Sequence, residues 1–391
     1  MVTHSKDTIE YNEIKKIYKR VRGTPITAER MSKIKSATGA IRVFAGGATE
    51  IRANVSDLPN ANIISDPVVI VQSRGVIDFI YCNVPCTFKN EMWGYTSSDI
   101  YAVKFLFYYL KHNVDYFRNA GDGRSSFSQI SLPVTEEYKI PLLSSKEQQA
   151  IASVLSDFDE HIDNLSELIE KKKAIRDGAL EDLVSGRTRL DGFNREWEEK
   201  SFKDLGDILT GLTYSPDNIR PSGKLVIRSS NVQDDRLSFE DNVFVDRTCV
   251  ISEDIKKGDI IICVRNGSVS LIGKSAYASS DLDATFGAFM SNFRCKNHDS
   301  SGFVYYFTKS AMFKNFVKQI LGATINQITK TDLKRVTLNI SVDIEEQQAI
   351  ASVLTAMDEE IESLKIGKEK MIQIKEGAMD DLLTGRVRLK V

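Results

Sequence analysis

The side chains best suited to binding chemistry in this sequence are arginine, lysine, asparagine, glutamine and serine residues in two variable blocks of the chain. Arginine can pair with guanine, and asparagine or glutamine with adenine, in the major groove of DNA. A single such residue is more often an exposed loop residue, but together they form two candidate DNA-reading surfaces. The predicted DNA contacts are Arg42, Arg52, Arg74, Lys89, Arg124, Ser125 and Ser126 in the first block, and Arg228, Asn231, Arg236, Arg265, Asn266, Lys274, Asn326, Gln327 and Lys330 in the second.

Patterns for catalysis or cofactor binding do not emerge from the sequence. The stretch from Gly267 to Ser275 resembles a phosphate-binding loop, but five residues lie between its two glycines where the motif has four, which puts the backbone cradle out of register. No Gly-x-Gly-x-x-Gly follows a predicted strand, and no Ser/His/Asp or metal-carboxylate cluster is present. We therefore expect no catalytic residue and no cofactor held by this chain.

The five cysteines also argue against a metal centre or a disulfide framework. Cys82 and Cys86 are the only close pair, and the four histidines supply no further clustered ligands for zinc. We expect this pair to be structural.

The composition, 42% hydrophobic and 27% charged residues, indicates a globular protein. With 391 residues, the chain is long enough for two or three packed domains. The apolar runs are too short to cross a bilayer, and the N-terminus is polar, so we expect a cytoplasmic protein without a membrane partner. The net charge is only −2, but a nucleic-acid ligand could still bind locally clustered Lys and Arg side chains.

An internal duplication dominates the organisation of the chain. The segment Glu147–Leu155 returns letter for letter as Glu346–Leu354, and the match continues without a gap to Gly186-Arg-Thr-Arg-Leu190 and Gly385-Arg-Val-Arg-Leu389. The sequence therefore divides into a first block (1–143), a first repeat (144–194), a second block (195–343) and a second repeat (344–391). Such a duplication can fold back into a pseudo-twofold arrangement.

Each repeat has the apolar spacing of a long amphipathic helix. Ser145-Lys-Glu-Gln148 has the form of a capping box, Asp343 offers a cap for the second helix, and Gly186 and Gly385 lie where the helices should end. Because both stripes share one pattern, we predict that they pair as an antiparallel coiled coil with the blocks at its opposite ends. The predicted pairing residues are Ile151, Leu155, Phe158, Ile162 and Leu165 in the first copy and Ile350, Leu354, Met357, Ile361 and Leu364 in the second; the same stripes continue through Ile175 and Ile374.

The two blocks show the same order of predicted elements, which makes the fold α+β with two mixed domains. Each has three short strands, a long helix and a glycine-containing turn. The strands are predicted at 40–44, 68–72 and 76–82 and at 225–228, 259–264 and 268–272, and the helices at 98–117 and 302–320. Ser-Gln-Ile130 and Asn-Gln-Ile328 occur at matching positions ahead of the two repeats.

The repeats resemble those of the specificity subunits of type I restriction-modification enzymes. The resemblance is carried by Glu-Gln-Gln-Ala-Ile at both helix starts, by the helix ends from Gly178 to Leu190 and from Gly377 to Leu389, and by the entry segment from Trp197 to Ile208. The first block has the different entry Tyr11-Asn-Glu-Ile-Lys-Lys-Ile17.

This resemblance implies that each block is a target recognition domain that reads one half of a split, asymmetric site in double-stranded DNA. It also implies that the paired helices bind two methyltransferase subunits, with restriction and motor subunits joining for cleavage. S-adenosylmethionine and ATP would then belong to those partners. The subunit itself would be non-catalytic.

Two alternatives remain open at this point. One is an enzyme, such as a methyltransferase or nuclease whose motif has drifted. The other is a coiled-coil adaptor that never contacts DNA.

Overall fold

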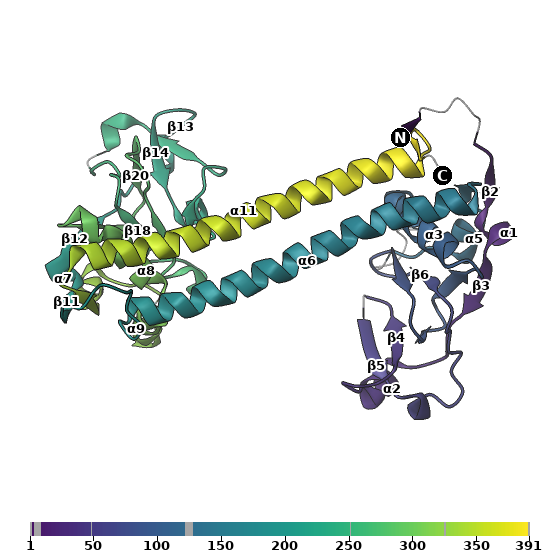
Figure 1. Ribbon diagram of the computed structural model, residues 1–391. Coiled ribbons are helices and arrows are strands. Elements are labelled where there is room, and N and C mark those ends of the chain that lie inside the picture. The colour runs from purple at the N-terminus through teal and green to yellow at the C-terminus, as the bar shows by residue number, and fades with distance from the viewer. Residues whose placement is uncertain are drawn as a thin grey trace. The chain divides into compact units, whose positions relative to one another are not determined.

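A computed structural model describes residues 2–3, 9–47, 49–121, 128–250, 252–323 and 326–389. The chain forms two compact units, one made of Met1–Ser166 and Ile366–Val391, the other of Glu167–Lys365. Each of these, called unit 1 and unit 2 below, contains one block and part of both long helices (Figure 1).

The two repeats form the long helices α6 (Ser145–Val184) and α11 (Ile344–Leu383), as predicted. The capping box of α6 lies one residue earlier than expected, because Ser144 and Glu147 exchange the capping hydrogen bonds. Asp343 caps α11 by accepting a hydrogen bond from the backbone N–H of Glu345 at 3.1 Å. Gly186 and Gly385 end the helices with a φ of 72° each, in the left-handed region that favours glycine.

Unit 1 contains a mixed domain of short strands and helices. Its elements are β2 (Tyr11–Glu13), α1 (Ile14–Ile17), β3 (Lys19–Arg22), α2 (Ala28–Ile34), β4 (Ile41–Ala45), β5 (Thr49–Ala53), β6 (Val68–Gln72), β7 (Asp78–Cys82), β8 (Cys86–Phe88), β9 (Trp93–Thr96), α3 (Ile100–His112), α4 (Val114–Asn119), α5 (Leu132–Glu136) and β10 (Lys139–Pro141). The short strands β1 (Val2–Thr3) and β23 (Arg388–Leu389) pair with each other in the same unit.

Unit 2 contains a second mixed domain. Its elements are β11 (Trp197–Ser201), α7 (Phe202–Leu205), β12 (Gly206–Thr210), β13 (Ile219–Arg220), β14 (Lys224–Ile227), β15 (Val232–Gln233), β16 (Arg236–Leu237), β17 (Val243–Val245), β18 (Ile260–Cys263), β19 (Ser275–Tyr277), β20 (Ala284–Phe286), β21 (Met290–Cys295), α8 (Ser301–Lys309), α9 (Ala311–Ala323), α10 (Lys330–Lys334) and β22 (Thr337–Ser341).

The two domains share one topology although their amino-acid sequences differ. A four-stranded antiparallel sheet has the order β3-β9-β6-β7 in unit 1 and β12-β21-β18-β19 in unit 2. A second sheet joins β4 to β8 in parallel in unit 1, and β14 to β20 in parallel in unit 2. β6 and β18 therefore occupy equivalent places, which confirms the expectation of two domains with one order of elements.

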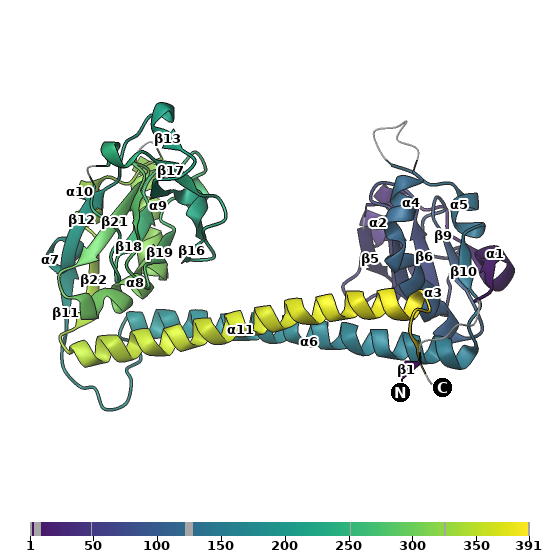
Figure 2. The same cartoon turned by 90° about the horizontal axis from the view of Figure 1, so that it is seen from above.

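In each unit one core joins the four-stranded sheet, a covering helix and the helix pair (Figure 2). In unit 1, Leu155 of α6 and Leu382 of α11 share a core with Phe105 of α3. In unit 2, Leu354 of α11 and Leu183 of α6 share the corresponding core. The start of one helix thus packs with the end of the other in both units, which confirms the predicted α+β fold with an antiparallel helix pair.

Several sequence predictions needed correction at the level of single elements. The segment 268–272 is not a strand but contains a short 3-10 turn at Val269–Leu271, and the strand follows at β19. Each predicted long helix is broken, the first at Asn113 between α3 and α4, and the second at Ser310 between α8 and α9. Among the residues that the structure describes, no helix has the length and apolar character needed to span a membrane.

Candidate DNA interface and its helical frame

The two halves of the repeat motif bind each other within each unit. In unit 2, Arg189 of Gly-Arg-Thr-Arg-Leu donates hydrogen bonds of 2.8 and 2.6 Å to Glu346 of Glu-Gln-Gln. In unit 1, Arg388 donates to Glu147 at 2.7 Å. Arginine suits this role because its guanidinium group can engage both carboxylate oxygens. The two sequence motifs therefore form one interlocking contact, made twice.

The carboxylate of Glu346 is fully buried, and its polar atoms need partners. The indole N–H of Trp197 adds a hydrogen bond of 3.1 Å to those from Arg189. Burial raises the pKa of Glu346, but the hydrogen bonds outweigh it and hold the pKa below its usual value. The ionised carboxylate is thus the form that the folded unit stabilises.

A second repeated contact lies further along the helices. Tyr108 donates to Asp159 at 2.6 Å in unit 1, where Lys375 of α11 also pairs with Asp159. In unit 2, Tyr306 donates to Asp358 at 3.0 Å, where Arg176 of α6 pairs with Asp358. One tyrosine from each domain thus connects its covering helix to a charged pair between α6 and α11.

The predicted pairing residues differ in how deeply they are buried. Ile151, Leu155, Ile350, Leu354 and Ile361 are buried, whereas Phe158, Ile162, Leu165, Met357 and Leu364 are partly buried. The predicted continuation of the stripes is wrong at two positions, because Ile175 and Ile374 are 59% and 54% exposed. Closer to the C-terminal end of each helix, the buried residues correspond between the two repeats. They are Leu180, Leu183 and Val184 in α6, and Met379, Leu382 and Leu383 in α11.

Two arginines lie at equivalent positions in the two domains. Arg74 follows β6 and forms a backbone bridge to Gln129, and Arg265 follows the equivalent strand β18 and forms one to Gln327. The neighbouring backbone bonds also match, because Ile130 donates to Ser73 at 3.0 Å and Ile328 donates to Val264 at 2.8 Å. Both arginine side chains are exposed. This places an exposed arginine beside a glutamine in each domain.

The loop in unit 2 is held in place by its neighbours. The guanidinium group of Arg265 lies 5.1 Å from the centre of the Phe289 ring, which is itself 52% exposed. The amide of Asn266 donates to Ser229 at 2.9 Å and accepts from the backbone of Ser268. The loop therefore presents one arginine in a fixed setting, as direct contact with a base edge requires.

Other predicted contact residues are occupied by partners within the protein. Arg42 is paired with Glu50, Lys89 with Glu91, Arg228 with Asp241 and Arg236 with Glu362. Asn231 is fully buried, and its amide donates to the backbone of Ser238 and Asp241. The predicted base contact at Asn231 is therefore wrong, because this side chain is enclosed by the protein.

The remaining predicted contact residues are more accessible. Arg52, Lys274, Asn326, Gln327 and Lys330 are exposed. Arg124, Ser125 and Ser126 lie outside the described residues. Within the described ranges, no group of three or more His, Cys, Asp or Glu side chains could hold a metal ion.

Sequence reasoning did not select Gln129 or Phe289 as site residues. A signal for Gln129 was present, since Ser-Gln-Ile130 matches Asn-Gln-Ile328 in position, and the structure shows that both segments bridge the arginine loop. Phe289 had no such signal, because only the sheet brings it next to Arg265.

The repeated topology and the interlocking helix motifs define a duplicated scaffold with one exposed arginine loop in each domain. The profile of the type I restriction modification DNA specificity domain matches residues 25–173 and again 194–373. The chain therefore belongs to this family, the specificity proteins of type I restriction-modification systems, and contains two such domains.

Similar proteins agree with this assignment. The chain is 26% identical over 322 residues to the specificity subunit of the type I restriction enzyme MjaVIII of Methanocaldococcus jannaschii, which covers 77% of this chain and 73% of that protein. It is 30% identical over 201 residues to the EcoKI specificity subunit of Escherichia coli, which covers 50% of this chain and 43% of that protein.

Solved structures share the fold. The S subunit of a type I system from M. genitalium superimposes with a TM-score of 0.67 at 17% identity, over 97% of this chain and 96% of the other. A chain from a study of complex assembly and conformational transition in the type I system gives 0.56 at 12% identity, over 96% and 97% of the chains.

Proposed function

We propose that this protein is the non-catalytic DNA-recognition subunit of a type I restriction-modification complex. Each domain reads one half of a bipartite, asymmetric site in double-stranded DNA. The domain boundaries are those expected from the sequence, with recognition domains at 1–143 and 195–343 and repeat segments at 144–194 and 344–391. Because DNA is the proposed ligand, we also propose that the protein is cytoplasmic.

The observation that carries the proposal is the equivalence of the Arg74 and Arg265 loops in two domains of one topology. An exposed arginine can donate two hydrogen bonds to guanine, and the adjoining glutamine can bond adenine. Because the residues around the two loops differ, the two domains are expected to recognise different bases. This combination supports an asymmetric site.

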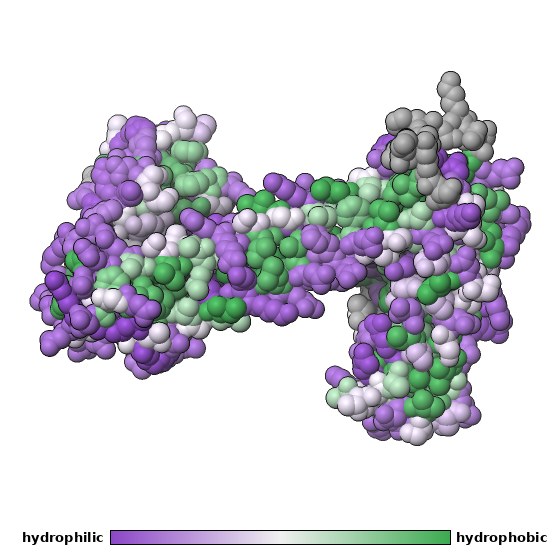
Figure 3. All heavy atoms as spheres, in the orientation of Figure 1, coloured by the Kyte–Doolittle hydropathy of each residue, from purple (hydrophilic) through white to green (hydrophobic). Residues whose placement is uncertain are grey.

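We further propose that the helix pair binds two methyltransferase subunits, to which restriction and motor subunits are added. Ile175 and Ile374 support this, because they occupy the same position in the two repeats and remain more than half exposed. Hydrophobic surface is visible along the two helices (Figure 3). A repeated apolar residue outside the core fits one partner bound twice.

The proposal is tested by expressing the chain with its methyltransferase partner in a host that lacks the system, and then mapping methylated adenines across the genome. We expect a single motif of two unlike half-sites separated by a fixed number of unspecified bases. The chain incubated alone with DNA and labelled S-adenosylmethionine should transfer no methyl group. Methyl transfer by the isolated chain would contradict the non-catalytic assignment.

A coiled-coil adaptor without DNA contact is the second candidate. A mobility-shift titration of the complex with methyltransferase on random duplexes distinguishes the two. DNA recognition predicts binding that weakens as salt rises, because phosphate contacts release counterions. The adaptor predicts no difference between the complex and methyltransferase alone.

A further inference from the structure

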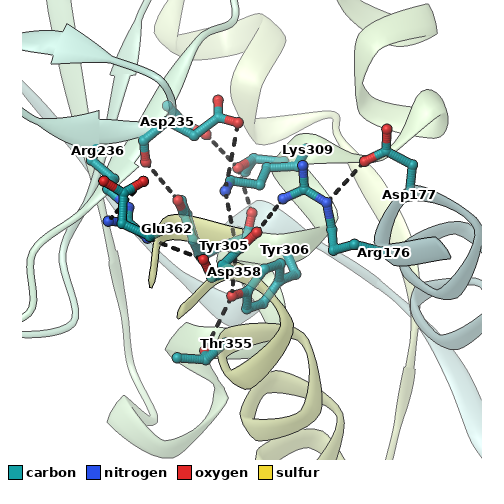
Figure 4. Close-up of polar contacts among 12 residues, drawn as sticks. Arg176, Asp177, Asp235, Arg236, Tyr305, Tyr306, Lys309, Thr355, Asp358 and Glu362 are labelled. Atoms are coloured by element: carbon teal, nitrogen blue, oxygen red, sulfur yellow. Dashed lines mark hydrogen bonds and ion pairs between the residues drawn. The ribbon is translucent and has the colours of Figure 1, made fainter. Parts of the chain in front are cut away.

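A buried lysine in unit 2 joins the recognition domain to the helix pair. Lys309, the last residue of α8, is only 7% exposed, and its ammonium group lies 3.6 Å from Asp235 and 3.7 Å from Asp358 of α11 (Figure 4). It also lies 4.5 Å from the centre of the Tyr305 ring. Burial lowers the pKa of Lys309, and the two carboxylates act in the opposite direction.

The residue on the domain side, Asp235, belongs to a tight hairpin. β15 and β16 pair Val232 with Leu237 and Gln233 with Arg236, which leaves Asp234 and Asp235 as the turn. Both have positive φ, 46° and 63°, as a two-residue hairpin turn requires, and aspartate tolerates this region better than most residues. The hairpin tip therefore has a defined shape.

The helices hold this tip at several points. Tyr305 of α8 donates to the backbone carbonyl of Asp235 at 2.7 Å. On α11, Lys365 lies 3.7 Å from Asp234, and Glu362 lies 3.7 Å from Arg236. The tip thus contacts both the covering helix and the helix pair.

The base of the same hairpin connects to the Arg265 loop. The buried amide of Asn231 donates to the backbone of Ser238 at 3.0 Å, closing the hairpin base, and its oxygen accepts from the backbone N–H of Arg228. Ser229, within the same turn, accepts the hydrogen bond from Asn266. A continuous series of polar contacts therefore runs from α11 through the hairpin to the residue next to Arg265.

Unit 1 shows a different arrangement at the equivalent lysine. Lys111 follows Tyr108 by the same three residues that separate Lys309 from Tyr306, but it pairs with Asp78 of β7 at 2.7 Å. The tyrosine–aspartate contact is shared by both domains, whereas the hairpin contact is a feature of unit 2.

We propose that the hairpin Val232–Leu237 fixes the orientation of the Arg265 loop relative to the helix pair within unit 2, and we call this hairpin the latch. Lys309 and Asp235 are its positioning residues. This inference rests on the proposed function. A loop held rigidly on the helices accepts only one distance between half-sites, whereas a released loop tolerates neighbouring distances. The latch therefore contributes to selection of the spacer and not of the bases.

The test uses Lys309→Met and Asp235→Asn in the full chain with its methyltransferase partner. Methionine keeps most of the buried volume but removes the ammonium charge. The two carboxylates are not left without compensation, because Asp358 keeps its ion pair with Arg176 and the Asp235 side chain is 45% exposed to water. Asparagine keeps the shape of the turn and accepts positive φ. The matched control is Lys111→Met, which removes the equivalent lysine of unit 1 outside any latch.

Methylation is measured on duplexes that carry both half-sites with the native spacer or with one base pair added or removed. For both latch variants we expect the ratio of methylation at altered spacers to that at the native spacer to rise about tenfold, a change that corresponds to about 1.4 kcal/mol. The half-site sequences and the ratio for Lys111→Met should not change.

An unchanged ratio in both latch variants would overturn the proposal, and so would an equal loss of methylation at every spacer. Thermal unfolding of each purified complex identifies a variant that fails to fold, and the other variant then decides. Absence of any two-part motif with the unaltered protein would instead refute the proposed function, so the two failures are distinguishable.

Discussion

Replacing Leu354 by Ala is expected to lower the free energy of unfolding by about 3 kcal/mol, and Leu155→Ala should have a similar effect. Both leucines are fully buried where α6 and α11 meet the core of a unit, so truncation leaves a cavity. Equilibrium denaturation of the purified chain, with one transition expected for each unit, measures the effect. Leu354→Ala should shift the transition of unit 2, and Leu155→Ala that of unit 1.

Ile175→Ala and Ile374→Ala provide the matched controls on the same helices. Their side chains are more than half exposed, so each change should alter the unfolding free energy by less than about 0.5 kcal/mol. The double variant should instead retain less methyltransferase on an affinity column. A loss of stability equal to that of the leucine variants would contradict this, because it would show that the two isoleucines contribute to the buried contact between α6 and α11.

The second large effect concerns the arginine loops. Arg74→Ala and Arg265→Ala are each expected to weaken binding of the complex to its cognate duplex by about tenfold to a hundredfold, because one bidentate base contact contributes about 1–3 kcal/mol of discrimination. The two variants should relax specificity in different half-sites. Binding to duplexes with single base changes, measured at one fixed salt concentration, provides the comparison.

Arg42→Ala is the control for this prediction, because Glu50 already occupies that guanidinium group with hydrogen bonds of 2.6 and 2.8 Å. We expect at most about a threefold change in binding. If Arg42→Ala weakened specific binding as much as the loop variants while Arg74→Ala and Arg265→Ala had no effect, the assignment of the reading loops would be wrong.

The helical frame could be predicted from the sequence because its signals are local and occur twice. Apolar residues at helical spacing, Asp343 before α11 and Gly186 after α6 each act within a few residues. The strand predicted at 268–272 was wrong, because a short run of apolar residues is compatible with a 3-10 turn as well as with a strand. The exposed Ile175 shows a similar limit, because spacing alone cannot indicate which part of a stripe finds a partner.

The candidate site was harder to predict because its contacts join distant parts of the chain. Arg189 and Glu346 are 157 residues apart, so neither motif shows from its letters that it binds the other. The partners of Arg42 and Arg236 likewise come from other elements, Glu50 on β5 and Glu362 on α11. The sequence identified side chains that could contact DNA, but only the fold shows which of them are already occupied.

The most direct test of the account lengthens both helices together. One heptad inserted after Ser166 in α6 and one after Lys365 in α11 fall at the boundaries of the two units, and so leave the contacts inside each unit intact. Each insertion adds about 10 Å of helix, or about three base pairs of DNA. Mapping methylated adenines should then show the original half-sites with a longer spacer, whereas an unchanged spacer or altered half-sites would contradict a helical frame that carries two DNA readers.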